Sequence, residues 1–281
     1  MTARTIKAQH EAYRDDIGDL VTRRPVPGPR IAQVDPFLFL NHHGPQIYPP
    51  NNDGLPFGPH PHRGFETVTF ILDGELGHYD SGGHASIIRA GGVQWMTAGS
   101  GIVHAELSPP EFKRDGGPME ILQLWLNLPA RLKFAAPAYV GLQRDDIPAA
   151  RIDGGEVRVI AGAFAGVRGP VHSLIDAFMA IVSLKAGARV TLPAPRGRTV
   201  FFYVARGALK DAPQWRLIEW NDDGDEVVIE ATADSVVLYG HAAPFNEPVF
   251  AHGPFVMNTR EEIIQAITDY QAGKFGDAPV V

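Results

Sequence analysis

Two short segments of this sequence place potential metal ligands two residues apart. The segment GPHPHRGFETVTFILDG (58–74) contains His60 and His62, and GSGIVHAEL (99–107) contains His104 and Glu106. In an extended chain, residues i and i+2 point to the same face, and Pro61 favours an extended conformation at His60. If the two segments form adjacent strands, three imidazoles and one carboxylate meet. That set suits a divalent first-row metal such as Fe, Mn, Ni, Cu or Zn.

Glu66 is the alternative carboxylate ligand. It follows His62 by four residues, which is about 13 Å along a regular strand, so it reaches the same metal only if the chain bends at Gly64. We therefore expect Glu66 to lie outside the ligand set and to form a salt bridge or a contact with a ligand, with Arg63 as a candidate partner. The chain contains no cysteine, which excludes thiolate ligands, disulfides and a cysteine nucleophile.

The remaining histidines carry weaker signals. His42 and His43 stand together in LNHHGP, just before a turn, and either line the mouth of the metal site or lie in a surface loop, the commoner case. His78 and His84 are isolated in the sequence, and we assign them no role.

Short β-rich segments dominate the chain and must position these residues. Eight of them are bounded by glycine, proline, asparagine or aspartate, and the chain has 30 glycines and 24 prolines, which favours a β-sandwich or β-barrel. The segments are ETVTFILDG, GVQWMTAG, MEILQLWLNLP, EVRVIAGAF, FMAIVSLKAG, RTVFFYVARG, DEVVIEA and DSVVLYG. One segment, NTREEIIQAITDYQAG, predicts a helix, because Thr259 and Glu262 form a capping-box pattern.

The sequence also contains an internal repeat. Residues 60–76 align with residues 192–209, so that Thr67 matches Thr199 at an offset of 132 (199 − 67). At this offset Leu192 and Ala194 replace the two histidines of the first copy. The repeat predicts a metal-binding domain at 1–140 and a second β domain at 150–281, which lacks metal ligands and carries the terminal helix.

The composition of the chain limits the classes of molecule that it is expected to bind. The net charge is −7 and no basic cluster is present, which argues against a direct nucleic-acid ligand. The first residues lack the apolar segment of a secretory signal, and no stretch approaches the ~18 apolar residues of a membrane span. We therefore expect a cytoplasmic protein that does not bind membranes.

Five motifs resemble the pirin family of the cupin superfamily. They are HPHRGFETVTFILDG (60–74), GGVQWMTAGSGIVHAE (91–106), DPFLFLNHHGP (35–45), LQLWLNLP (122–129) and NEPVFAHGPFVMNTREEI (246–263). The resemblance extends from about residue 15 to 277. It implies an all-β bicupin of two tandem jelly-roll-like barrels, in which only the N-terminal barrel binds metal. Carried over residue by residue, the ligands are His60, His62, His104 and Glu106.

The resemblance also implies an activity. Pirin-like proteins and related cupins are known as quercetin 2,3-dioxygenases, which open a flavonol ring with O₂ and release CO. The expected cofactor is one Fe(II) ion, with Mn, Ni, Cu or Zn as alternatives. The expected substrates are a flavonol-like aromatic molecule and O₂, with Glu106 as the catalytic base.

Two other functions remain open. Some pirins act as metal- or redox-sensing regulators through protein partners, so a protein partner is an alternative to a flavonol substrate. Sugar-type cupins, including isomerases, tend to place the carboxylate at the position of Glu66, which disfavours that reading here.

Overall fold

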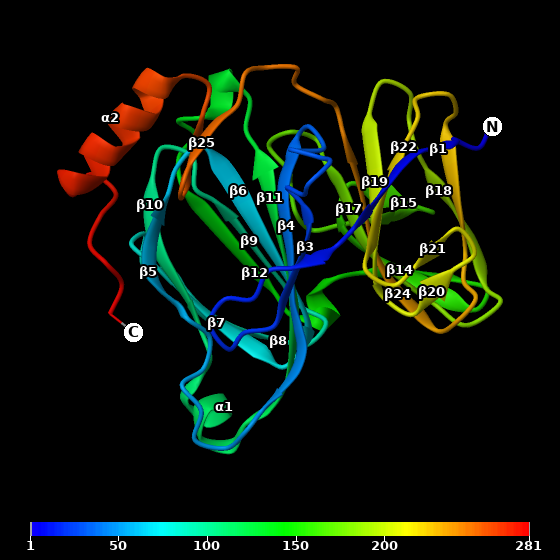
Figure 1. Cartoon of the computed structure of the whole chain (residues 1–281), viewed down its shortest axis with the longest axis horizontal. Coiled ribbons are helices and arrows are strands. Elements are labelled where there is room, and N and C mark those ends of the chain that lie inside the picture. Colours follow the sequence, from blue (N-terminus) through cyan, green and yellow to red (C-terminus); the bar gives the residue numbers. More distant parts are fainter. Residues whose placement is uncertain (1, 281) are drawn as a thin grey trace. The chain divides into compact units, whose positions relative to one another are not determined.

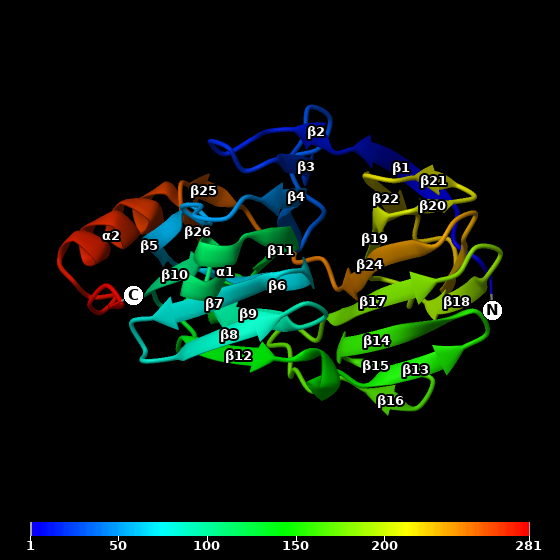
Figure 2. The same ribbon diagram turned by 90° about the horizontal axis from the view of Figure 1, so that it is seen from below.

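The structure is a computed structural model that describes residues 2–280. The chain forms two compact units. Residues 14–22, 37–144 and 245–281 form one unit, here called the N-terminal barrel, and residues 1–13, 23–36 and 145–244 form the other, the C-terminal barrel. Figures 1 and 2 show that both consist mainly of strands, which confirms the predicted all-β class.

The eight predicted β segments all form strands, and the structure adds further strands between them. The N-terminal barrel contains β4 (Phe37–Tyr48), β5 (Phe57–His62), β6 (Phe65–Asp73), β7 (Glu75–Asp80), β8 (Ala85–Arg89), β9 (Val93–Thr97), β10 (Ile102–Leu107), β11 (Gly117–Asn127), β12 (Ala138–Leu142), β25 (Phe250–His252) and β26 (Phe255–Met257). The C-terminal barrel contains β1 (Ile6–Glu11), β13 (Ala149–Ile152), β14 (Gly155–Ala161), β15 (Ala163–Phe164), β16 (Val167–Arg168), β17 (Phe178–Leu184), β18 (Arg189–Pro193), β19 (Thr199–Arg206), β20 (Ala208–Leu209), β21 (Ala212–Pro213), β22 (Arg216–Trp220), β23 (Glu226–Glu230) and β24 (Ser235–Ala242).

The main sheets of the two barrels have corresponding strand orders. One order is β12-β9-β6-β11-β4-β3-β2, with β2 (Tyr13–Arg14) and β3 (Thr22–Val26) at its end, and the other is β1-β22-β19-β24-β17-β14-β13. The third strands, β6 and β19, contain Thr67 and Thr199, which the sequence repeat had aligned. The smaller sheet β5-β10-β7-β8 of the N-terminal barrel has the two-stranded sheet β18-β23 of the C-terminal barrel as its counterpart in the repeat. The sequence repeat therefore corresponds to a duplicated fold.

The predicted terminal helix is α2 (Arg260–Gln271). Its capping box is complete, because Thr259 Oγ1 accepts from the Glu262 amide and the Glu262 carboxylate accepts from the Thr259 amide. The structure also contains elements that the sequence did not predict: the short helix α1 (Pro110–Asp115), which has a proline at its start, and two 3₁₀ turns at Ala130–Leu132 and Arg144–Asp146. Neither α-helix of residues 2–280 has the length and apolar character to cross a bilayer.

The two ends of the chain differ from the predicted division at residues 140–150. Strand β1 pairs with β22 in the C-terminal barrel, although we placed it with residues 1–140. Helix α2 belongs to the N-terminal barrel, although we placed it with residues 150–281. The sequence repeat identifies the two cores, but pairing between distant segments assigns the terminal segments, and local patterns do not encode that pairing.

Candidate metal centre

Three predicted ligands meet on two adjacent strands of the N-terminal barrel. Strands β5 and β10 are antiparallel, and His60 lies opposite His104 in their register. The ring centroids of His60 and His104 are 4.4 Å apart, those of His60 and His62 4.8 Å, and those of His62 and His104 5.0 Å. One ring nitrogen from each histidine lies within 4.8 Å of the other two. This geometry suits a metal ion that binds all three rings.

Hydrogen bonds orient two of these rings. The Nδ1 atom of His60 lies 2.7 Å from the carbonyl oxygen of Gly58, and Nδ1 of His62 lies 3.2 Å from that of Pro254. A carbonyl oxygen only accepts hydrogen bonds, so Nδ1 carries the proton in both rings and Nε2 is left as the metal-binding atom.

His104 is the strongest indication of a ligand. Its side chain is fully buried, and both ring nitrogens lack a hydrogen-bond partner among residues 2–280. A buried polar group without a partner costs about 1–3 kcal/mol, whereas a metal ion would satisfy one nitrogen. The three histidines therefore fit a divalent transition metal.

The surroundings of His62 and His104 favour their neutral rings, the form that binds a metal. Burial, together with the nearby His60, lowers the pKa of His62 to about 3. Burial and the neighbouring histidines also hold the pKa of His104 well below its ordinary value. His62 and His104 therefore offer lone pairs to a metal without first having to lose protons at neutral pH.

Glu106 lies on β10, two residues beyond His104, where the register with β5 is interrupted by a bulge. Its carboxylate accepts a hydrogen bond of 2.9 Å from Thr69 Oγ1 and one of 2.6 Å from Gln123 Nε2. It is not among the ligand atoms that cluster within 4.8 Å. The structure thus brings together three of the four predicted ligands and holds the fourth beside them through two side-chain donors.

Glu66 occupies the opposite face of β6. Successive residues of a strand alternate between faces, so Glu66 points away from the side on which Thr69 contacts Glu106. Its carboxylate accepts a hydrogen bond from Thr97 Oγ1 at 2.6 Å, and burial raises its pKa. The expected pairing with Arg63 is wrong, because Arg63 instead contacts Asp269 at 2.8 Å.

His42 and His43 were expected in a loop, and this expectation is wrong. Both are fully buried in β4. His42 Nε2 lies 2.7 Å from Glu120 Oε1 on β11, and His43 Nδ1 lies 2.8 Å from Thr22 Oγ1. The interior of the barrel is thus more polar than the apolar strand pattern had indicated.

Several residues near the centre were missed from the sequence. His78 on β7 lies opposite Glu106 in the register with β10, and its ring is 5.4 Å from that of His104. It contacts Asp80 Oδ2 at 2.9 Å and stacks on Tyr139 at 3.9 Å. His78 and Asp80 are two residues apart, as are His60 and His62. This spacing was the one feature of the sequence that could have identified them.

Comparisons with known proteins identify the family of this chain. The family model described as Pirin matches residues 19–126, and the model described as Pirin C-terminal cupin domain matches residues 179–276. The chain is 42% identical over 253 residues to a pirin-like protein of Caulobacter vibrioides, covering 88% of this chain and 90% of that protein. It is 37% identical over 268 residues to human pirin, covering 90% and 87%.

A solved structure supports the same relationship over the whole chain. The crystal structure of a quercetin 2,3-dioxygenase from Acinetobacter baumannii superposes with a TM-score of 0.92 at 35% identity, covering 99% of this chain and all of that one. Two matching family models, close relatives and this shared two-barrel fold together show that the chain belongs to the pirin family of cupin proteins.

Proposed function

We propose that this chain is a metal-dependent quercetin 2,3-dioxygenase that uses His60, His62, His104 and Glu106. The main support is the cluster of three histidines, in which the buried His104 has no hydrogen-bond partner among residues 2–280. The name of the structurally similar Acinetobacter protein supports the choice of reaction. Fe(II) is the preferred metal, with Mn, Ni, Cu and Zn as alternatives.

The metal, when bound, supplies Lewis acidity and orients the flavonol. The three imidazoles of His60, His62 and His104 would hold it. Glu106 accepts the proton of the flavonol 3-hydroxyl. The buried surroundings of the three histidines strengthen these electrostatic interactions, because fewer water molecules screen them. Overall, one O₂ is consumed, the heterocycle opens to a depside and CO leaves.

Thr69 and Gln123 position the base in this proposal. Both side chains donate to the Glu106 carboxylate, one to each oxygen. They restrict its orientation, so that the lone pairs they leave unused face the reacting hydroxyl. A positioned base of this kind contributes about 10²–10⁴-fold to a rate.

Oxygen uptake and CO release with quercetin test the proposal. Purified protein is stripped of metal, reloaded with each of the five divalent metals in turn, and compared with His60→Ala/His104→Ala treated in the same way. We expect CO in proportion to bound metal in the wild type and none in the double variant. Absence of CO from the wild type with every metal would overturn the enzymatic proposal in favour of a regulatory role.

A further inference from the structure

The C-terminal segment, residues 250–276, packs against β10, which carries His104, and against the loops that follow β5 and precede β10. This segment, here called the C-terminal cap, comprises β25, β26, α2 and the turn that follows. Figures 1 and 2 show α2, in red, beside β5 and β10. Val103 of β10 and the cap residues Phe255, Ile263 and Phe275 belong to one buried apolar cluster.

The first contact between the C-terminal cap and the ligand-bearing strands is at His62. The carbonyl oxygen of Pro254 lies 3.2 Å from His62 Nδ1 and also accepts from the Arg63 amide at 3.4 Å. The Val256 amide donates back to the Arg63 carbonyl at 3.0 Å. The cap therefore supplies the acceptor that fixes the orientation and tautomer of one ligand ring.

The approach between the cap and this loop is too close for a side chain. Gly64 has φ of +89°, and a Cβ atom placed on it would lie 2.0 Å from the Val256 carbonyl oxygen. The buried Lys133 bridges the same two segments, because its Nζ donates to the carbonyl oxygens of Gly64 at 2.8 Å and Val256 at 2.9 Å.

The side chain of Arg63 joins the loops beside the two ligand-bearing strands to helix α2. It donates to Asp269 Oδ2 at 2.8 Å and to the Ser100 carbonyl oxygen at 2.7 Å, and its guanidinium lies 4.5 Å from the Phe275 ring centroid. The side chains of Arg63 and Asp269 are only 6% and 11% exposed. A pair this buried loses much more when one partner is removed than an exposed pair does.

Phe275 makes the third contact, at the start of β10. A Cβ atom on Gly101 would lie 2.5 Å from the Phe275 ring. The Phe275 carbonyl oxygen accepts from Ser81 Oγ at 2.6 Å, and the same Oγ accepts from the Val103 amide at 3.1 Å. The cap thus touches the loop after His62, the loop before His104 and the turn after β7.

We propose that the C-terminal cap positions the metal ligands, so that docking of the cap and binding of a divalent metal at His60, His62 and His104 stabilise each other. This inference rests on the metal site of the proposed function, but not on the reaction. Partners that orient a metal-bound histidine typically change metal affinity by about 10–100-fold. Because coupling between two sites is reciprocal, metal binding must stabilise cap docking by the same factor that docking contributes to affinity.

The first test measures zinc(II) affinity by competition with a chelator, since zinc is redox-inert and needs no turnover. Asp269→Asn and Phe275→Ala weaken cap contacts and touch no proposed ligand, and each should raise the Kd about tenfold. Asp234→Asn removes the charge of an exposed pair with Lys185 in the C-terminal barrel. Ile264→Ala truncates an exposed apolar side chain of α2. Both controls should leave the Kd unchanged.

The second test measures amide hydrogen exchange of residues 260–276 in the unmodified full chain, so it decides the question even where a variant fails to fold. Saturating zinc(II) should slow this exchange about tenfold, and it should have no such effect in His60→Ala/His104→Ala. Tight zinc binding with unchanged cap exchange and unchanged Kd in both cap variants would overturn the coupling alone. Failure of the wild type to bind any of the five metals would overturn both the coupling and the proposed function.

Discussion

The two barrels share a strand order but differ where a metal would bind. In the N-terminal barrel, His60 on β5 lies opposite His104 on β10. In the C-terminal barrel, Leu192 on β18 lies opposite Val227 on β23. Leu192 is the repeat counterpart of His60 (60 + 132 = 192), so Val227 is the counterpart of His104. Two residues further along each pair of strands, Ala194 corresponds to His62 and Ile229 to Glu106.

These substitutions convert a polar site into an apolar core. The four counterparts, Leu192, Ala194, Val227 and Ile229, are at most 1% exposed and belong to one hydrophobic cluster. In the N-terminal barrel, the carboxylate of Glu106 is instead surrounded by donors. One fold therefore supports either a packed core or a polar centre, and function depends on the side chains placed in it.

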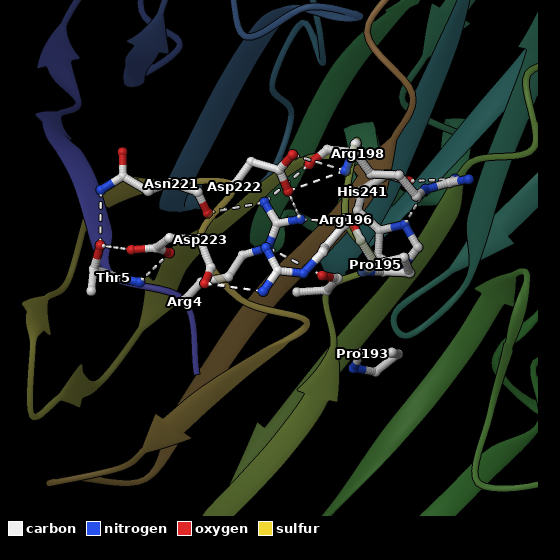
Figure 3. A network of polar contacts seen from close by, with 12 residues as sticks. Arg4, Thr5, Pro193, Pro195, Arg196, Arg198, Asn221, Asp222, Asp223 and His241 are labelled. Atoms are coloured by element: carbon white, nitrogen blue, oxygen red, sulfur yellow. Dashed lines mark hydrogen bonds and ion pairs between the residues drawn. The ribbon is translucent and has the colours of Figure 1, made fainter. Parts of the chain in front are cut away.

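In each barrel, a segment near one end of the chain also binds the loop that follows β5 or its counterpart β18. In the N-terminal barrel, the C-terminal cap binds Arg63. In the C-terminal barrel, the side chain of Arg4, which is 1% exposed, enters from the start of the chain (Figure 3). Its guanidinium donates to the carbonyl oxygens of Ala194, Pro195, Arg198 and Asn221 and to Asp222 Oδ1. The loop after β5 therefore follows a candidate ligand, His62, and is held by the C-terminal cap. The loop after β18 is held by Arg4 but follows no candidate ligand.

The largest expected effect concerns metal content. His60→Ala/His104→Ala should lose metal binding while remaining folded, because strands elsewhere supply the core. Wild type should bind one metal equivalent per chain, since Leu192 and Ala194 cannot ligate. Elemental analysis of folded protein after gel filtration measures both. Full occupancy in the double variant, or two equivalents in wild type, would contradict this contrast between the barrels.

The next largest effect separates the two carboxylates. At equal metal occupancy, Glu106→Gln should reduce quercetin turnover by about 10²–10⁴-fold, because an amide cannot take up the hydroxyl proton. Glu66→Gln should cost far less, because Glu66 lies on the other face of β6. Oxygen uptake and CO release measure both variants. An inactive Glu66→Gln beside an active Glu106→Gln would reverse our assignment of the base.

A smaller effect tests the apolar core of the C-terminal barrel. Ile229→Ala should lower the free energy of unfolding by about 2–5 kcal/mol, because it leaves a cavity in a packed core. Metal stoichiometry should not change. Leu174→Ala, at a position 44% exposed in the same barrel, should cost at most about 0.5 kcal/mol. Denaturant unfolding measures both, and similar costs for the two variants would count against the core assignment.

The last effect is a pH dependence of stability in the C-terminal barrel. Burial and the nearby Arg198 lower the pKa of His241 from 6.5 to about 3. Between these values the unfolded chain binds the proton and the folded chain does not, so this contribution to stability is lost as the pH falls from 6.5 towards 3. The slope is at most about 1.4 kcal/mol per pH unit.

His241→Gln isolates this contribution. Arg198 Nε donates to His241 Nδ1 at 2.9 Å, and a glutamine oxygen can accept the same bond without titrating. Denaturant unfolding of metal-free protein at pH 4, 5 and 7 should show a shallower loss for the variant than for the wild type. Parallel curves would mean that His241 takes up its proton equally in both states.

The sequence by itself determined the candidate ligands, their spacing and the duplicated scaffold. His60, His62 and His104 follow from the i, i+2 spacing within extended segments, which is a local property. The strands β6 and β19 follow from their apolar composition, and α2 follows from its capping box. These features depend on residues only a few positions apart, so they can be predicted without the tertiary structure.

Only the tertiary structure decided how distant segments meet. Pro254 orients His62 across 192 residues of sequence, and Asp269 pairs with Arg63 across 206. The same holds for the donors that Thr69 and Gln123 present to Glu106, and for the burial of His42 in β4. No local pattern encodes these contacts, because strand register and the docking of terminal segments depend on the packing of the whole barrel. The sequence thus identified the atoms that would bind a metal, and the fold supplied the groups that orient them.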